Sequence, residues 1–348
     1  MRVVVVGATG NVGTSTLRAL LSDERVDSIL GVARRRPALE LPKVEWVEAD
    51  VRSADLTSLF KGAGAVVHLA WLIQPSRNES ETESVNVVGS ERVFGAVAEA
   101  GVPRLVYASS VGAYSPGPKD ELVDESHPTD GIETSFYSRH KAAVERILDR
   151  FESSVTSVSV ARLRPGLIFK ADAASEIRRL FAGPFLPNAL LIRSLIPIVP
   201  SVPDLRFQAV HSFDVGDAYA KAVFSEATGA FNIAADPVLD PERIGRLLAA
   251  RPVKVPQGLL RSVTSATWHL RLQPTPPGWL DLALQVPLMS SERARRELGW
   301  EPSHSADEAL LELLDGLRRG QGISTPPLDP RTGGPLRAGE LATGVGAR

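Results

Sequence analysis

The sequence predicts an α/β protein built on a doubly wound parallel sheet, and three features of the chain support this fold class. An uninterrupted run of valines at 3–6 is typical of a strand buried on both faces, as a central strand of a parallel sheet is. A glycine-rich turn at 7–13 leads from this strand into an amphipathic helical pattern. Such strand–helix units then repeat, as parallel sheets with right-handed crossovers require. The further expected strands lie at 27–33, 44–47, 65–70 and 104–108.

The composition excludes several classes of protein. The 39 Lys and Arg residues nearly balance the 41 Asp and Glu residues of the 348-residue chain, so we expect no nucleic-acid partner. The chain has no cysteine, which excludes disulfides, thiolate catalysis and Cys-ligated metals and fits a reducing cytoplasm, where we expect the protein. The histidines lack metal-ligand spacing, and no apolar run approaches the roughly 18 residues that span a bilayer. We therefore expect no metal site and no membrane span.

The glycine-rich turn GATGNVG has the spacing of a loop that binds a dinucleotide. Its three glycines would allow a tight turn, close approach of a pyrophosphate to bare backbone, and tight packing of the next helix on the strand. The N-terminus of that helix would point unpaired N–H groups at the phosphates. The alternative is an ordinary glycine turn between two elements. The expected cofactor-binding residues of this loop are Gly7, Thr9, Gly10, Asn11, Val12 and Gly13.

The ends of the second and third strands concern the adenosine half of a dinucleotide. Arg34 and Arg35, followed by a third arginine, stand where a carboxylate would bind the ribose 2′-OH of NAD. Guanidinium groups suit a 2′-phosphate, so we expect NADP in preference to NAD. The alternative is a solvated basic turn. Asp50 and Val51 are expected to meet the adenine, although Asp50 would equally suit a cap on the following turn or helix.

The fourth strand ends where an open parallel sheet binds its ligands. Leu69 and Ala70 stand at this end, so we expect them to contact the cofactor. His68 lies inside the apolar run and fits a structural histidine better than a catalytic one.

Catalytic residues are expected after the fifth strand and on the helix that follows. Ser110 comes almost directly after the strand, and Tyr137 and Lys141 are spaced to share one face of a helix. A tyrosine with a reference pKa of about 10 needs a nearby cation to act as a base at neutral pH, and Lys141 would supply it. Ser110 would then bond the substrate oxygen while Tyr137 exchanges a proton. The alternative is an ordinary helical pair.

With these motifs in this order, the chain resembles the extended short-chain dehydrogenases/reductases of the NAD-dependent epimerase/dehydratase type, over about residues 1 to 315. The resemblance implies a Rossmann-type domain at 1–165, with a returning segment at about 205–235, and a substrate-binding part at 166–204 and 236–319. It also implies a possible homodimer and a structural role for Asn86. Residues 320–348 lack periodicity, so a flexible or loosely docked tail is expected there.

Departures from the family pattern narrow the expected reaction. Val111 and Gly112 replace the Asp-Glu pair of the dehydratases, and Leu167 replaces an asparagine that helps epimerases hold a nucleotide diphosphate. The segments at 180–202 and 259–288 are apolar, which suits a hydrophobic small-molecule substrate. Alternatively they form a core or a dimer contact.

We therefore expect an NAD(P)-dependent oxidoreductase that transfers hydride between the nicotinamide and a carbinol or carbonyl carbon. Tyr137 and Lys141 are also expected to contact the cofactor, Lys141 at its ribose. The alternative reaction is nucleotide-sugar epimerisation. The alternative of another class is a sensor that binds dinucleotide without turnover.

Overall fold

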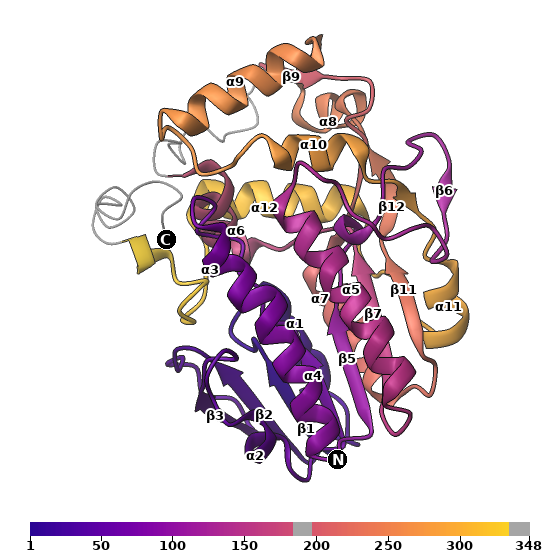
Figure 1. Ribbon diagram of the computed structural model, residues 1–348. Coiled ribbons are helices and arrows are strands. Elements are labelled where there is room, and N and C mark those ends of the chain that lie inside the picture. The colour runs from indigo at the N-terminus through magenta and orange to yellow at the C-terminus, as the bar shows by residue number, and fades with distance from the viewer. Residues whose placement is uncertain (184–196, 334–348) are drawn as a thin grey trace.

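The computed structural model describes residues 1–183 and 197–333, and its centre is a seven-stranded parallel sheet (Figure 1). The strands run in the order β11-β7-β5-β4-β1-β2-β3, so consecutive strands lie to one side of β1 and then to the other. This change of direction between β1 and β4 is the place where doubly wound sheets bind ligands. The predicted fold class is confirmed. The strands are β1 (Arg2–Val6), β2 (Ser28–Ala33), β3 (Val44–Glu48), β4 (Ala65–His68), β5 (Arg104–Ala108), β7 (Ser159–Pro165) and β11 (Gly229–Ile233).

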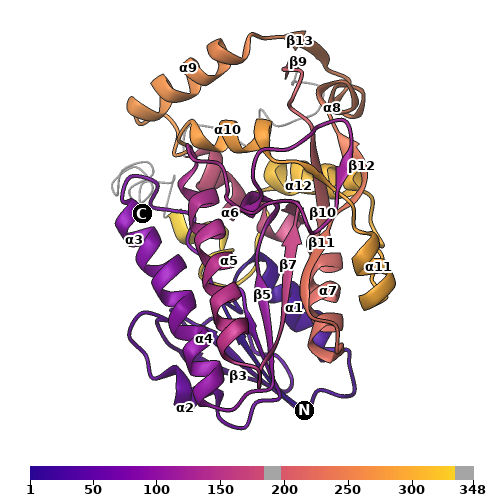
Figure 2. The ribbon, with the colours of Figure 1, turned by 45° about the vertical axis from the view of Figure 1, so that its right-hand side comes forward.

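Helices cover both faces of the sheet because its central strands are apolar on both sides. Alternate valines of β1 enter two separate cores. On one face they pack with α1 (Asn11–Leu21) and α7 (Ser212–Phe224). On the other they pack with α2 (Leu56–Phe60), α4 (Gly89–Glu99) and α5 (Phe136–Ser154), as Figure 2 shows.

The helical segment before β5 consists of three consecutive parts. α3 (Glu79–Glu83) begins at Asn78, whose side chain accepts a hydrogen bond from the N–H of Glu81. A π-helical turn at Ser84–Val88 then joins α3 to α4. This turn holds the buried Asn86, whose amide bonds both the N–H (2.7 Å) and the carbonyl (2.8 Å) of Leu72. Asn86 therefore fixes the loop after β4.

The returning segment expected at 205–235 contains β10 (Phe207–His211), α7 and β11, and β11 pairs with β7 at the edge of the main sheet. Most of the remaining elements, together with β10, form small sheets and helices at the carboxyl ends of the main strands, whereas α11 (Glu292–Leu298) packs beside β11 and α7 (Figure 2). Their strands are β6 (Leu122–Val123), β8 (Leu167–Phe169), β9 (Ile198–Ser201), β10 (Phe207–His211), β12 (Ala235–Leu239), β13 (Arg251–Lys254) and β14 (Leu288–Met289). Their helices are α6 (Ala174–Ile177), α8 (Pro241–Leu248), α9 (Gln257–His269), α10 (Gly278–Gln285), α11 (Glu292–Leu298) and α12 (Ala306–Arg319).

Residues 320–333, the described part of the segment expected to be a flexible or loosely docked tail, lie against the body of the protein. Leu328 is fully buried, and the buried Thr325 donates a hydrogen bond to the carbonyl of Thr9 (2.9 Å). The segment is held by hydrogen bonds and one leucine rather than by a periodic apolar face, so composition does not reveal these contacts. The rest of the expected tail, 334–348, lies outside the described residues, as does the central part of the apolar segment at 180–202.

In 1–183 and 197–333, no helix is both long and apolar enough to cross a bilayer. The same residues contain no group of three or more His, Asp or Glu side chains placed to hold a metal ion.

Candidate active site

The glycine-rich loop has the geometry that a dinucleotide phosphate needs. Gly7 has a φ of 90°, and a Cβ there would lie 2.6 Å from the backbone nitrogen of Ala70. A Cβ at Gly13 would lie 2.3 Å from the carbonyl oxygen of Gly7, so α1 packs directly on the loop. Gly10 caps α1 without a side chain, which leaves the first N–H groups of the helix open to an anion. The geometry of the loop therefore fits the dinucleotide pyrophosphate that the sequence predicts.

The other expected residues of the loop have mixed environments. Thr9 is buried, and Val12 packs against the core beneath α1. Asn11 donates a hydrogen bond to the carbonyl of Ile168 (3.2 Å), while its Oδ1 is buried without a protein partner. An unpartnered buried acceptor at the start of α1 is a polar group that a bound ligand or water would satisfy.

Lys170 is a cation beside this loop that sequence reasoning missed. Its side chain is buried, and Nζ donates to the carbonyl of Asn11 (2.9 Å) and to the hydroxyls of Thr14 (2.7 Å) and Ser15 (3.0 Å). Burial lowers the pKa of Lys170 to about 8, while nearby carboxylates act in the opposite direction. A lysine directly after an apolar strand was the available signal. Its charge at the first turn of α1 favours an anionic ligand there.

The adenosine end of the expected site gathers several arginines. Arg34 and Arg35 are exposed at the end of β2. Asp50 accepts a two-pronged ion pair from Arg52 (2.7 Å from Nη2), which lowers the pKa of the Asp50 carboxyl. Asp50 also accepts the Arg52 N–H (2.9 Å), as the turn-capping alternative requires. Sequence reasoning missed Arg52, and Val51 is buried and points into the core beside Gly89. Whether Asp50 and Val51 also meet an adenine stays a prediction.

The loop after β4 completes the wall of the expected cofactor site. Leu69 donates its N–H to the carbonyl of Val6 (2.8 Å), which keeps this loop beside β1. Leu69 and Ala70 are half-buried, and the close approach of Ala70 to Gly7 joins the two expected cofactor loops. His68 is buried and bonds Ser90 (2.9 Å), in keeping with a structural role.

The expected catalytic serine and tyrosine come together where β5 ends. Ser110 begins a short turn at Val111–Ala113, and its Oγ accepts the N–H of Gly112 (3.0 Å). Ser138 on α5 donates to the carbonyl of Gly112 (2.5 Å), which fastens this turn to the start of the helix. A Cβ at Gly112 would lie 2.9 Å from the ring of Tyr137, so glycine is required for this close approach. Burial raises the pKa of Tyr137 to about 12, although a hydrogen bond with Ser110 acts in the opposite direction.

Lys141 lies one helical turn after Tyr137 on the same face of α5. Its buried Nζ donates to the carbonyl of Ala108 (2.6 Å) and lies 5.9 Å from the centroid of the Tyr137 ring. Burial lowers the pKa of Lys141 well below its usual value, partly offset by the charge of Glu145. The structure thus brings Ser110, Tyr137 and Lys141 together, although their roles in a reaction stay predictions.

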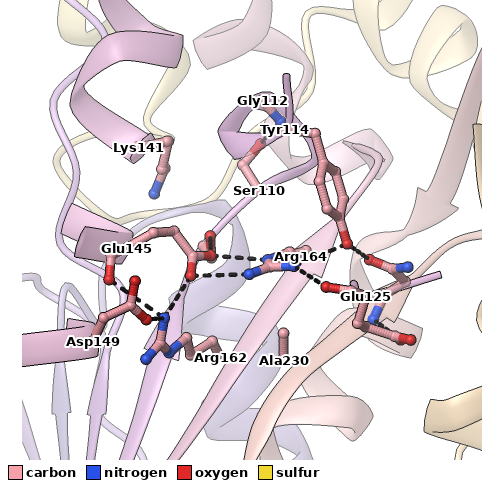
Figure 3. A network of polar contacts seen from close by, with 12 residues as sticks. Ser110, Gly112, Tyr114, Glu125, Lys141, Glu145, Asp149, Arg162, Arg164 and Ala230 are labelled. Atoms are coloured by element: carbon pink, nitrogen blue, oxygen red, sulfur yellow. Dashed lines mark hydrogen bonds and ion pairs between the residues drawn. The ribbon is translucent and has the colours of Figure 1, made fainter. Parts of the chain in front are cut away.

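A network of buried charges lies beneath this set (Figure 3). Glu145, fully buried and one turn after Lys141, accepts hydrogen bonds from Ser109 (2.5 Å), Arg162 (2.8 Å) and Arg164 (2.9 Å). Burial works to raise the pKa of Glu145, but Arg164 and Arg162 outweigh it and lower the pKa to about 2. The network joins α5, the end of β5 and β7, and therefore fixes the positions of Ser110 and Lys141 relative to each other. Sequence reasoning missed it because its members are far apart in the chain.

Aromatic side chains surround the Tyr137 ring. Trp279 of α10 lies 4.8 Å from it between centroids, and Trp71 lies 5.9 Å away, edge-on. Phe181 packs against Trp279 at 5.0 Å. The indole Nε1 atoms of both tryptophans are buried without a protein partner. The surroundings of the tyrosine are therefore largely apolar and aromatic.

This fold and site define a dinucleotide-binding α/β protein with a Ser, Tyr and Lys set beside the phosphate loop. Residues 3–182 match the family model described as "NAD dependent epimerase/dehydratase family", and the chain belongs to that family. This confirms the predicted family. It also supports an enzyme of the short-chain dehydrogenase/reductase kind.

Three curated relatives illustrate the range of the similarity. An uncharacterized protein of Mycobacterium tuberculosis is 26% identical over 321 residues, which are 91% of this chain and 30% of that protein. The chain thus spans less than a third of that relative. The 3 beta-hydroxysteroid dehydrogenase/Delta 5-->4-isomerase of Mycobacterium tuberculosis is 25% identical, covering 90% of this chain and 89% of its own. L-arabinose 1-dehydrogenase (NAD(P)(+)) of Haloferax volcanii is 40% identical, over 50% of this chain and 70% of its own.

Two solved structures share the fold. MoeE5 in complex with UDP-glucuronic acid and NAD has a TM-score of 0.66 at 21% identity, over 92% of this chain and 99% of that one. UDP-glucose 4-epimerase of Thermotoga maritima, solved with UDP-glucose, has a TM-score of 0.69 at 18% identity, over 92% and 99% of the two chains. At these identities the likeness shows the fold alone.

Proposed function

We propose that the protein is an NAD(P)-dependent oxidoreductase that acts on a carbinol or carbonyl carbon of a hydrophobic small molecule. The observation that carries this proposal is the proximity of the buried Ser110 and Lys141 to the half-buried Tyr137 at the carboxyl end of β5. The loop after β4, which contacts Lys141 through Trp71 and Gly7 through Ala70, links this set to the glycine-rich loop. A bound nicotinamide would accept or donate the hydride at the reacting carbon. The residues of the chain then have to position the substrate oxygen and move its proton.

Each member of the set has a role that its environment supports. Ser110 donates a hydrogen bond to the substrate oxygen, and Tyr137 takes or gives the proton of that oxygen. Because burial raises the pKa of Tyr137 to about 12, the phenolate needs a cation, and Lys141 is the ammonium group nearest along the helix. Gly7 to Gly13 would hold the pyrophosphate, and Lys170 would add positive charge at the first turn of α1.

A hydrophobic substrate is supported by the aromatic side chains around Tyr137. Trp71, Trp279 and Phe181 offer flat apolar surfaces rather than charged groups. The relative that acts on hydroxysteroids is in keeping with such a substrate, whereas the relative that acts on arabinose is not.

Nucleotide-sugar epimerisation is the second candidate, supported by the match to the family model described as an epimerase/dehydratase family. The two reactions differ in the fate of the cofactor. A reductase consumes NAD(P)H in proportion to product, whereas an epimerase retains its cofactor and returns the hydride to the sugar. Measuring NAD(P)H consumption with panels of hydrophobic ketones and of UDP-sugars separates them. Turnover of a UDP-sugar without net consumption would reject the oxidoreductase assignment.

A Tyr137→Phe variant tests the catalytic assignment and the non-catalytic alternative together. Loss of the hydroxyl removes the proton carrier but leaves the phosphate loop unchanged. We expect cofactor affinity within about twofold of wild type and turnover reduced at least about a hundredfold. Undiminished turnover would show that Tyr137 is not the acid/base, and wild-type protein that binds cofactor but turns over neither panel would favour a sensor.

We further propose a preference for NADP, supported by Arg34 and Arg35 at the end of β2 and by Arg52 nearby. Two arginines free to reach a 2′-phosphate would favour NADPH by about tenfold or more. Titration of both reduced cofactors by fluorescence measures this, and equal affinities would reject it. A homodimer through α4 and α5 also stays a proposal, for which sedimentation measures the mass.

A further inference from the structure

The ammonium group of Lys141 is buried close to the ring of Tyr137. Among the described residues no carboxylate forms an ion pair with its ammonium group, and its hydrogen-bond partner is the neutral carbonyl of Ala108 (2.6 Å). Desolvation favours the neutral amine, yet only the ammonium form would stabilise the Tyr137 phenolate. The charge of Glu145 offsets this effect only in part, so a further group has to favour the charged form.

The ring of Trp71 is the nearest such group. Its centroid lies 3.4 Å from Lys141 Nζ, compared with 5.3 Å for Tyr107 and 5.9 Å for Tyr137. Tryptophan has the strongest attraction for a cation among aromatic side chains, and the attraction grows when water is excluded. Trp71 also contacts the Tyr137 ring edge-on, with an interplanar angle of 74°. One indole thus touches both members of the expected proton-transfer pair.

An aromatic ring suits this position better than a carboxylate would. A carboxylate at Nζ would also keep the lysine charged, but its negative charge would oppose formation of the phenolate. The indole has no net charge, so it stabilises the ammonium group while leaving the field of that group at Tyr137 largely intact. The nearest carboxylate on the helix, Glu145, is instead engaged by Arg162 and Arg164.

We propose that Trp71 is a positioning residue that keeps Lys141 protonated and directed at Tyr137 through contact of its ring face with the ammonium group. This proposal rests on the proposed function, since it assigns Trp71 a part in the same proton transfer. The loop after β4 can place the ring there because the amide of Asn86 fixes the neighbouring Leu72. The other titratable groups around Lys141 are His68, Tyr107, Tyr137, His140 and Glu145.

The test replaces Trp71 with Phe and with Leu. Phenylalanine keeps an aromatic face with a smaller quadrupole, whereas leucine keeps an apolar side chain that has no aromatic ring. NMR of protein labelled with 13C at lysine Cε follows the titration of Lys141, and a Lys141→Met variant assigns its signal. We expect the pKa of Lys141 to fall from Trp to Phe to Leu, by about one unit in total. In turnover, kcat should fall in the same order with a smaller change in KM.

Trp279→Phe and Trp279→Leu are the matched controls. Trp279 packs closer to the Tyr137 ring than Trp71 does, at 4.8 Å, but no contact joins it to Lys141 in the described structure. We expect these variants to leave the pKa of Lys141 unchanged. A pKa that is the same in all Trp71 variants, or that rises as water enters in Trp71→Leu, would overturn the proposal.

The titration does not require turnover, so the two proposals can fail separately. A graded fall in the pKa of Lys141 without turnover of any ketone or alcohol would reject the proposed function alone. Turnover that depends on Tyr137 while Lys141 titrates independently of residue 71 would reject the role of Trp71 alone.

Discussion

Replacing Glu145 with glutamine should be among the most destabilising single changes near the site. The carboxylate is fully buried and bonds Arg162, Arg164 and Ser109. The amide would leave the buried Arg164 without its anion and would remove one of the carboxylates that surround Arg162, which also pairs with Asp149 and Glu152. Lowering the pKa of Glu145 from 4.5 to about 2 corresponds to roughly 3 kcal/mol of stability at neutral pH, at 1.36 kcal/mol per pKa unit. Measured losses from breaking buried ion pairs are about 3–5 kcal/mol, which agrees.

Asp149→Asn is the matched control because Asp149 also bonds Arg162, at 2.7 Å. Its side chain is 62% exposed, so the loss should be at most about 1 kcal/mol. Urea unfolding of both variants at pH 7 measures the difference. Equal losses would refute the view that burial gives the Glu145 pair its strength.

The pH dependence gives a second check on Glu145. Because its folded pKa lies below the unfolded value, its contribution is present above about pH 4.5 and is lost as the pH falls toward 2. The stability difference between wild type and Glu145→Gln should therefore shrink across that interval. A difference that stays constant down to pH 2 would show that the carboxylate charge is not responsible.

Two further predictions concern the glycine-rich loop at 7–13. Gly13→Ala should lower cofactor affinity at least about tenfold, because its Cβ would meet the Gly7 carbonyl. The control variant Gly95→Ala has open space around its Cβ and should bind the cofactor normally. Calorimetric titration compares the two variants, and equal affinities would contradict the close-packing argument. Leu328→Ala should lower the free energy of unfolding by about 2–3 kcal/mol and release the segment that bonds Thr9 through Thr325. Cofactor binding should weaken as a result. Hydrogen exchange at 320–333 that stays as slow as in wild type would argue against this prediction.

The fold class and the expected catalytic set were predictable because both depend on sequence patterns over a few neighbouring residues. The valines of β1 and the glycines after it specify a buried strand, a turn and a helix over only a few residues. Tyr137 and Lys141 share a helix face by spacing alone, and Ser110 follows a strand whose end was readable from its apolar run. Each of these depends on neighbours in the chain.

The contacts that surround the glycine-rich loop and the expected catalytic set were decided only by the tertiary structure. Lys170 reaches the phosphate loop from β8, Trp71 reaches Lys141 from the loop after β4, and Thr325 reaches Thr9 from the far end of the chain. No periodicity relates such residues, because their distances depend on how the strands are ordered in the sheet. The sequence by itself therefore determined that a dinucleotide fold with a Ser, Tyr and Lys set would form. Packing between distant segments decided which side chains surround that set, since burial and charge act through space rather than along the chain.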